Sequence, residues 1–502
     1  MYKKFLLLIL FIPGALFSQN RVQDYINKEL KTDSLFINSV TGILAVDALG
    51  NEIASWNPDM PLLTASTMKT ITTGVALSVL GPDYRFSTKI AYDGKINRRG
   101  VLKGNLYIVG GADPTLGSKD TVAFSIDSIF GVWAQAVKAA GIKKIDGFVI
   151  ADDRFFVDET IPDGWSWGNL GYDYGSGTSG LSFCENLSYF EIEAGSDVGA
   201  PVRIRPLEPY ANGMTYINLV TTGEKGDGEN TSYYTSNLSP VGKFTGTYGI
   251  DRGLDTIARS NKYGPYTCAS AFAYYLKNKG IKYKGVSNIN DFTFKNGIEV
   301  SDSSTLILIT ETFSPRIQEI VNVTNRISNN FYAETFLKMI GKTLAGEGSY
   351  SASFRALKEY LNGKGLSTYG LTQNDGSGLS RQNYVSPRFF CNYYNLMSES
   401  DTFAEFFESL PGPGRPGTLE NVLKNEDTAL KSTIHAKSGS LSNVRCYAGY
   451  VDSAKGLLKF AILVNNFDCP TRMVQPKIEK FMKELAIFGT EVDEVKVNQV
   501  TK

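Results

Sequence analysis

The stretch Leu63-Thr64-Ala65-Ser66-Thr67-Met68-Lys69-Thr70 contains the only Ser-x-x-Lys in this chain of 502 residues. Apolar and small residues then recur at helical spacing as far as Gly81-Pro82, where proline cannot continue a helix. The pattern predicts Ser66 at a helix start, with Lys69 one turn further on the same side. A lysine whose neutral form is accessible can take the proton of a serine hydroxyl and make it nucleophilic. By itself the motif equally fits an N-cap serine followed by a surface lysine.

Two further motifs favour the interpretation of Ser66 as a nucleophile over that of an N-cap serine. Ser328-Asn329-Asn330 lies in a predicted loop before a helix, and Lys437-Ser438-Gly439 lies in a predicted strand near the C-terminus. Alone, the first is typical of a turn and the second of a strand edge. Together with Ser66 and Lys69 they predict a serine acyl-enzyme, because a nucleophile, a base and a second cation occur in the same chain.

With these three motifs the sequence resembles the penicillin-binding proteins. It is most similar to the low-molecular-mass class C group, the D-alanyl-D-alanine carboxypeptidase/endopeptidases with a large insertion between the first two motifs. Four more stretches carry the resemblance, which covers nearly the whole mature chain: 110–116, 163–167, 375–381 and 417–419. It implies an α+β fold, in which a serine β-lactamase/transpeptidase-like domain, an antiparallel sheet flanked by helices, carries a large β-rich insertion.

The chemistry expected of these residues is cleavage of a peptide through an acyl-enzyme. Ser66 attacks the carbonyl carbon, Lys69 accepts its proton, and Ser328 relays a proton toward the leaving amine with Lys69 or Lys437. Asn330 holds the peptide backbone of the substrate. The backbone N–H groups of Ser66 and Ser440 form the oxyanion hole. The residues expected to bind the substrate are Ser438, Gly439, Ser440, Arg381 and Asn169. The resemblance implies that the substrate is peptidoglycan stem peptide and that β-lactams inhibit the enzyme.

Two positions depart from the family pattern. Asn329 stands where the family usually has Asp, at a position outside the reacting groups. Asn169 stands where relatives commonly carry an Asp that, with the arginine at position 381, grips the charged end of a diaminopimelate side chain. The second departure bears on the choice of substrate.

The chain is predicted to be exported. Residues 1–18 contain Lys3-Lys4, an apolar run and then small residues, which is typical of a secretory signal peptide and implies a periplasmic protein. Residues 19–85 and 263–502 are predicted to form the catalytic domain, and 86–262 the β-rich inserted subdomains. Helices are expected at 127–140, 266–279, around 312–319, and at 330–344, 355–361, 387–397 and 474–488. Strands are expected at 42–46, 52–56, 433–437, 445–451 and 457–465.

Composition excludes several classes of function. Lys+Arg and Asp+Glu are equal at 51 each with no charge block, so nothing favours nucleic-acid binding. No apolar run after the leader reaches membrane length, so membrane association is at most peripheral, through a surface helix at 474–488 if that helix does not pack on a sheet. The five scattered cysteines predict buried residues with at most one or two disulfides. No metal site or cofactor motif is visible, and the oligomeric state stays open.

Two alternative functions share these motifs. A β-lactamase has the same three motifs but needs fast deacylation, and the insertion and the chain length favour a peptidase. A catalytically silent peptidoglycan-binding scaffold has the same fold, but here every reacting group is retained.

Overall fold

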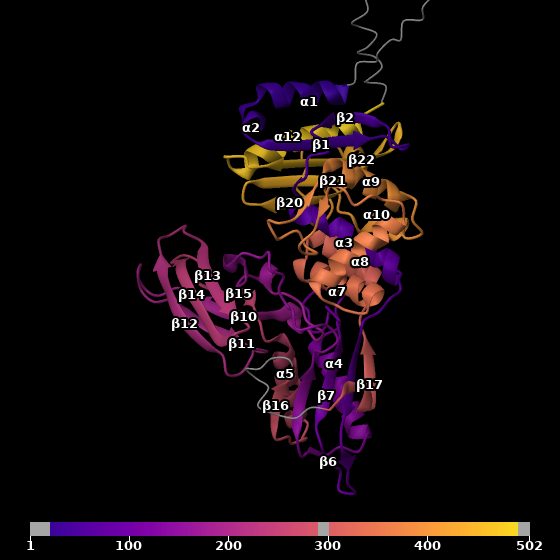
Figure 1. Cartoon of the computed structure of the whole chain (residues 1–502). Coiled ribbons are helices and arrows are strands. Elements are labelled where there is room, and N and C mark those ends of the chain that lie inside the picture. Colours follow the sequence, from indigo (N-terminus) through magenta and orange to yellow (C-terminus); the bar gives the residue numbers. More distant parts are fainter. Residues whose placement is uncertain (1–20, 290–300, 490–502) are drawn as a thin grey trace, which may run out of the picture.

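Segments from opposite ends of the chain build the central sheet of the computed structural model, which describes residues 21–289 and 301–489 (Figure 1). The sheet is antiparallel, in the order β2-β1-β22-β21-β20. Its strands are β1 (Val40–Val46), β2 (Glu52–Trp56), β20 (Ile434–Leu441), β21 (Val444–Ser453) and β22 (Gly456–Asn465). The five strands predicted from the sequence are confirmed. Strand β20 lies at one edge, so one side of it is free of a neighbouring strand.

Two helices cover one face of this sheet, α1 (Arg21–Thr32) and α12 (Thr471–Ala486). The apolar stripe of α12 is buried, which shows that this predicted helix packs on the sheet rather than on a membrane surface. Helix α1 was not predicted, although Val22, Ile26 and Leu30 recur at intervals of four and are all buried. A short helix, α2 (Ser34–Ile37), leads from α1 into β1.

The other face carries the helical half of the domain. Helix α3 (Met68–Leu80) has Lys69 as its only charged residue and is buried on all sides over most of its length. Its threonine hydroxyls donate hydrogen bonds to backbone carbonyl oxygens, which permits their burial. Gly81, with φ at 80°, ends it as predicted. The remaining helices of this half are α6 (Ile317–Ile327), α7 (Asn330–Ala345), α8 (Tyr350–Gly363), α9 (Pro387–Ser398) and α10 (Phe403–Ser409). The short helix α11 (Thr428–Ser432) packs instead on the side of α1 and α12, through Leu430. A small sheet completes this half, made of β3 (Leu62–Leu63), β18 (Leu371–Thr372) and β19 (Tyr384–Val385).

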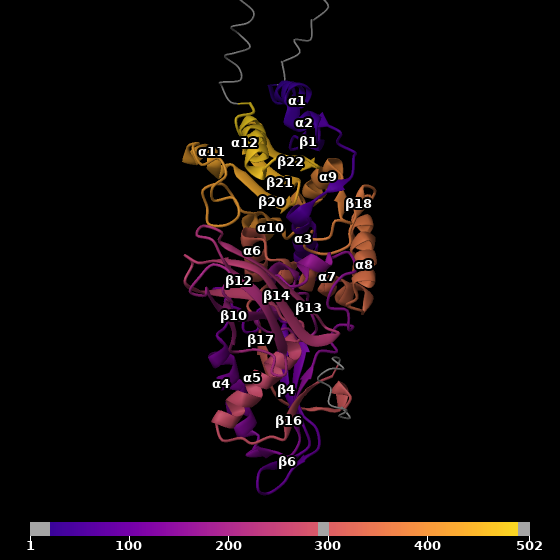
Figure 2. The same ribbon diagram turned by 90° about the vertical axis from the view of Figure 1, so that its left-hand side faces the viewer.

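The insertion contains a second five-stranded sheet, in the order β16-β9-β7-β4-β17, with α4 (Ile126–Ala139) and α5 (Gly264–Asn278) packed on it. The strands are β4 (Ser87–Tyr92), β7 (Leu106–Gly111), β9 (Phe148–Asp152), β16 (Gly285–Asn288) and β17 (Ile307–Phe313). A smaller sheet of β5 (Lys95–Ile96), β6 (Val101–Lys103) and β8 (Lys144–Ile145) lies at the end of the molecule away from the central sheet (Figures 1 and 2).

The predicted end of the insertion at residue 262 is wrong. Helix α5 and strands β16 and β17 follow this residue, yet they belong to the sheet of β4, β7 and β9. The chain returns to the catalytic half only at α6. An apolar stripe at helical spacing predicts that a helix packs on a sheet, but it does not show on which of two sheets the helix packs.

The helix predicted around 312–319 is also wrong in its position. Strand β17 runs to Phe313, and α6 begins only at Ile317, after Pro315. Strand β17 is an edge strand without fully buried residues, so its sequence lacks the alternation that would have identified it.

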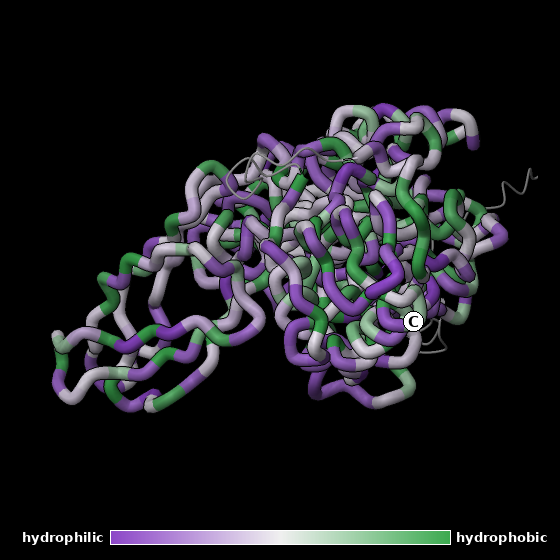
Figure 3. Tube along the Cα trace, turned by 90° about the horizontal axis from the view of Figure 1, so that it is seen from below, coloured by the Kyte–Doolittle hydropathy of each residue, from purple (hydrophilic) through white to green (hydrophobic). Residues whose placement is uncertain are grey.

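Residues 187–260 form a sandwich of two three-stranded sheets with a shared aromatic core. Hydrophobic and hydrophilic residues mix along these strands, in a lobe that projects from the rest of the molecule (Figure 3). One sheet contains β10 (Leu187–Glu193), β11 (Arg203–Leu207) and β15 (Leu254–Ser260). The other contains β12 (Thr215–Gly223), β13 (Glu229–Ser236) and β14 (Ser239–Gly249).

The cysteines form no disulfide among the described residues. Cys184, Cys268, Cys391 and Cys446 are buried, and Cys469 is half-buried. No helix in the described ranges has the length and apolar character needed to cross a bilayer. The predicted signal peptide, residues 1–18, lies outside the described residues.

Candidate active site

Ser66 lies in a 3₁₀ turn, Ala65–Thr67, that directly precedes α3. This differs slightly from the predicted first turn of an α-helix. Ala65 has φ at 45°, an unusual conformation for a residue with a side chain. The turn is held between two glycines. A Cβ atom on Gly378 would lie 1.8 Å from the carbonyl oxygen of Ala65, and one on Gly439 would lie 2.6 Å from that of Thr64. Only glycine therefore permits these close approaches of the backbone.

The Lys69 ammonium is fully buried beneath this turn. Its Nζ atom lies 3.0 Å from Ser66 Oγ, 2.6 Å from Asn330 Oδ1 and 2.8 Å from the carbonyl oxygen of Ser377. Burial lowers the pKa of Lys69 from 10.5 to about 7, although the nearby carboxyl groups of Asp375 and Glu334 act in the opposite direction. The neutral amine is therefore accessible near neutral pH, with its lone pair within reach of the Ser66 hydroxyl.

The Ser-Asn-Asn loop joins α6 to α7. Ser328 has a left-handed conformation at the end of α6, and Asn329 caps α7 by accepting a hydrogen bond from the Tyr332 N–H. Asn330 accepts from Lys69, and its Nδ2 donates to the carbonyl oxygen of Tyr174 at 2.9 Å. The loop thus places an amide between the buried amine and a segment of the insertion. In the described structure, no hydrogen bond joins the Ser328 hydroxyl to Lys69 or Lys437.

Lys437 lies on edge strand β20, which contacts the Ser66 turn. Its Nζ atom donates to the carbonyl oxygen of Ser438 at 2.9 Å. Burial, and then the positive charges of Lys69 and Arg445, lower the pKa of Lys437 well below its usual value. Ser440, on the same strand, is exposed. The free edge of β20 therefore offers backbone groups and a serine hydroxyl beside Ser66.

Two buried carboxyl groups support the Lys69 pocket. The Glu334 carboxylate accepts hydrogen bonds from the backbone N–H groups of Gly376 at 2.9 Å and Ser377 at 2.8 Å. Asp375 accepts hydrogen bonds from the Trp165 indole at 2.9 Å and from the Gly378 N–H at 2.7 Å. Burial raises the pKa of Glu334. These contacts fix the loop whose carbonyl oxygen faces Lys69.

Sequence reasoning assigned no role to Glu334 or Asp375, although Asp375 opens the stretch 375–381 that carries the family resemblance. A signal was present for Glu334, because it follows Asn330 by four residues in α7 and so lies on the same face.

The insertion contacts the Ser-Asn-Asn loop a second time through Glu185. Its Oε2 atom accepts a hydrogen bond from Asn329 Nδ2 at 2.7 Å, and its Oε1 atom accepts one from Ser118 Oγ at 2.7 Å. Burial raises the pKa of this carboxyl group. Asn329, the departure noted in the sequence, is thus matched to Glu185, because its amide donates to the carboxylate while its oxygen caps α7.

The structure brings Ser66, Lys69 and Asn330 into direct contact, but it does not join Asn169 to Arg381. Arg381 is exposed and donates to the carbonyl oxygen of Ser442 at 2.7 Å, just beyond β20. Asn169 is half-buried in a 3₁₀ turn, Trp167–Asn169, of the segment that reaches Asn330 through Tyr174. The two side chains share no hydrogen bond in the described ranges.

The chain is similar to known carboxypeptidases over most of its length. Residues 23–487 match the D-Ala-D-Ala carboxypeptidase 3 (S13) family. A D-alanyl-D-alanine carboxypeptidase from an Actinomadura species is 30% identical over 472 residues, covering 90% of this chain and 83% of the relative. The D-alanyl-D-alanine carboxypeptidase DacB of Haemophilus influenzae is 24% identical over 465 residues, covering 88% of each chain.

The fold is that of penicillin binding protein 4 from H. influenzae. Its crystal structure has a TM-score of 0.78 at 21% sequence identity and covers 93% of this chain and 100% of that one. The predicted α+β class is confirmed by this likeness and by the sheets described above.

We predict that Asn329→Asp destabilises the protein in a pH-dependent manner. Two carboxyl groups would then be in contact, which raises their pKa values in the folded state. The folded state would bind more protons than the unfolded state, so stability would fall as pH rises above about 4. We expect a loss of about 1–3 kcal/mol in the free energy of unfolding at pH 8 and a smaller loss at pH 5, measured by denaturant titration.

The matched control exchanges the amide and the carboxylate between positions 329 and 185. In the double variant Asn329→Asp with Glu185→Gln, an amide again faces a carboxylate, and most of the lost stability should return. If the double variant is no more stable than Asn329→Asp alone, the contact does not hold the loop.

Proposed function

The chain belongs to the D-Ala-D-Ala carboxypeptidase family that residues 23–487 match, and from this premise we propose that it is an exported serine DD-peptidase of the bacterial cell wall. It releases the terminal D-alanine of peptidoglycan stem peptides and cuts D-Ala–diaminopimelate cross-links. The observation that carries the proposal is the buried Lys69 amine, 3.0 Å from Ser66 Oγ and bonded to Asn330 of the second motif.

Acylation begins when Ser66 Oγ attacks the carbonyl carbon of the penultimate D-alanine. The hydroxyl proton of Ser66 passes to the neutral Lys69 amine. The oxyanion that forms accepts hydrogen bonds from the backbone N–H groups of Ser66 and Ser440. When the C–N bond breaks, the leaving amine takes a proton through Ser328, supplied by Lys69 or Lys437. The product is an ester between Ser66 and the shortened peptide.

Deacylation uses Lys69 as the general base a second time, now toward water. A water molecule gives its proton to the neutral Lys69 amine as its oxygen attacks the ester carbonyl, and the proton then returns to Ser66 Oγ as the ester bond breaks. Lys69 is neutral again for this step once it has passed the Ser66 proton to the leaving amine through Ser328. Where Lys437 supplied that proton, Lys69 returns one to Lys437 before deacylation, so the proton balance closes.

The substrate is held along β20. The hydroxyls of Ser438 and Ser440, with Gly439 between them, bind the terminal carboxylate. This anion favours the protonated form of the buried Lys437 amine, whose pKa is otherwise lowered. Asn330 holds the peptide backbone. A free strand edge suits an extended peptide, because it offers unpaired backbone donors and acceptors.

The same attack explains inhibition by β-lactams. Ser66 opens the lactam ring, but the leaving amine stays attached to the acyl group. A β-lactamase would need rapid release of this ester, and the large insertion favours a peptidase acting on a polymer. A silent scaffold is disfavoured by the direct contact of Lys69 with Ser66. The peptidoglycan substrate and the leader-like N-terminus support a periplasmic location.

We predict that acylation by benzylpenicillin occurs on Ser66 alone. Peptide mapping of the adduct by mass spectrometry should find the added mass in the peptide containing Ser66, and Ser66→Ala should remain unlabelled. An adduct on another serine would contradict the assignment of the nucleophile.

We predict that the acylation rate rises with pH with a midpoint near 7. Lys69 has its pKa lowered to about 7, so the amine is protonated and inactive below this pH and accepts the serine proton above it. Stopped-flow measurement with saturating benzylpenicillin checks the profile. A flat profile, or a Lys69→Ala variant retaining more than about a tenth of the rate, would assign the base to another group.

We predict that Asn169→Asp tightens binding of peptides with a free diaminopimelate end. A carboxylate in place of the amide would meet the ammonium of that side chain, worth about 1–2 kcal/mol, or a 5- to 30-fold lower KM. A diacetyl-lysyl-D-Ala-D-Ala peptide lacks this ammonium and should be hydrolysed with an unchanged KM. If neither KM changes, Asn169 does not face the substrate.

A further inference from the structure

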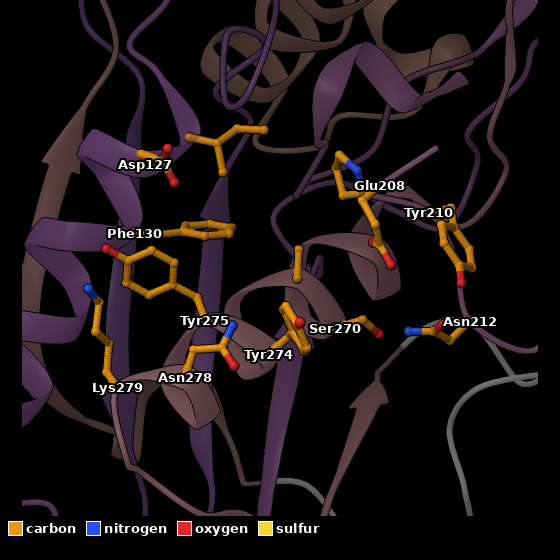
Figure 4. A pocket seen from close by; sticks show the side chains of 13 residues that line it. Asp127, Phe130, Glu208, Tyr210, Asn212, Ser270, Tyr274, Tyr275, Asn278 and Lys279 are labelled. Atoms are coloured by element: carbon orange, nitrogen blue, oxygen red, sulfur yellow. The ribbon is translucent and has the colours of Figure 1, made fainter. Parts of the chain in front are cut away.

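A groove of about 510 Å³ lies in the insertion (Figure 4). None of the residues around Ser66 lines it. One wall is α5, where Ser270, Tyr274 and Asn278 follow one another at intervals of four and so share a face. The facing wall is the segment 208–212, which follows β11 of the sandwich, and α4 closes one end with Phe130. The volume is within the roughly 300–1,000 Å³ of sites for small ligands, and such sites favour the junctions between subdomains.

Aromatic rings form much of the lining. Tyr274 is 62% exposed, and Tyr275 and Tyr210 contribute two further rings. Phe130 packs edge-on against Tyr275, which fixes the position of the Tyr275 ring. Within residues 21–289 and 301–489, Tyr274 stacks on no other aromatic ring, so the groove presents this ring to solvent.

Polar side chains surround these rings. Asp127 comes from α4, Asn278 from α5, and Glu208 and Asn212 from the facing segment 208–212 (Figure 4). In the described part of the chain, none of these four side chains makes a hydrogen bond or an ion pair. Carboxylates accept hydrogen bonds, and amides both donate and accept them. The groove thus offers both kinds of partner around an apolar floor.

We propose that this groove binds the glycan strand of peptidoglycan, a β-1,4-linked polymer of N-acetylhexosamines. A pyranose has an apolar C–H face that stacks on an aromatic ring, and a rim of hydroxyl and acetamido groups that donate and accept hydrogen bonds. The aromatic floor and the unpaired carboxylates and amides match these two surfaces. The choice of this particular polymer rests on the proposed function.

A cationic ligand fits the groove less well. The two carboxylates would attract a cation, but the Lys279 ammonium already lies 5.2 Å from the centre of the Tyr275 ring. It would repel a second positive charge at that face, whereas it can donate hydrogen bonds to a neutral sugar. The groove shares no residue with the Ser66 site, so a strand bound there leaves β20 free for the stem peptide.

The test measures binding of chitotetraose, the β-1,4-linked tetramer of N-acetylglucosamine, to the mature protein by isothermal titration calorimetry. We expect one tetramer per chain, and a dissociation constant about tenfold weaker for Tyr274→Ala, equivalent to about 1.4 kcal/mol. The matched control is Tyr369→Ala, which removes a tyrosine that is 87% exposed in the catalytic half and should not change the affinity. Thermal unfolding of each variant shows that the fold is intact.

Two outcomes would overturn the assignment: no binding of the tetramer at millimolar concentration, or equal affinity of the wild type and Tyr274→Ala. Binding of tetralysine in place of the tetramer, lost in Tyr274→Ala, would also overturn it in favour of a cation site. Penicillin labelling of Ser66 separates this result from the proposed function. A protein that is labelled but does not bind the tetramer loses only the groove assignment, and one that binds the tetramer without labelling loses only the enzymatic mechanism.

Discussion

The buried Lys69 amine is the group on which the rest of this site depends. An ammonium removed from water favours its neutral form, and here burial outweighs the opposing charges of Asp375 and Glu334. Its three neighbouring oxygens come from Ser66, Asn330 and Ser377, in three separate parts of the chain. A lysine at the same place in an exposed helix would be protonated at neutral pH and could not accept a proton.

Burying that amine requires a dense surrounding structure. Helix α3 is enclosed on all sides, and Glu334 and Asp375 use their carboxyl oxygens to hold the loop 375–378 against it. Gly378 and Gly439 let two backbone segments approach the Ser66 turn more closely than any side chain would allow. The left-handed conformation of Ala65 is tolerated because these contacts surround it.

The insertion also takes part in this arrangement. Tyr174 accepts a hydrogen bond from Asn330, and Glu185 accepts one from Asn329, so two segments of the insertion contact the second motif. A buried lysine, Lys262, donates to the carbonyl oxygen of Gly175 at 2.6 Å and steadies the segment that contains Tyr174. The insertion therefore supports the geometry of the site while remaining outside its central sheet.

The sequence alone predicted the three motifs, the five strands of the central sheet and most of the helices, because these features depend on local spacing and on apolar period. It did not predict that α5, β16 and β17 belong to the insertion, since a local pattern does not choose between two sheets. Nor did it show the pairing of Glu185 with Asn329 or the roles of Glu334 and Asp375. Those contacts join residues far apart in the chain: 42 positions separate Glu334 from Gly376, 144 separate Glu185 from Asn329, and 210 separate Trp165 from Asp375. Only the folded chain brings such groups together, and only there does burial change the pKa of Lys69.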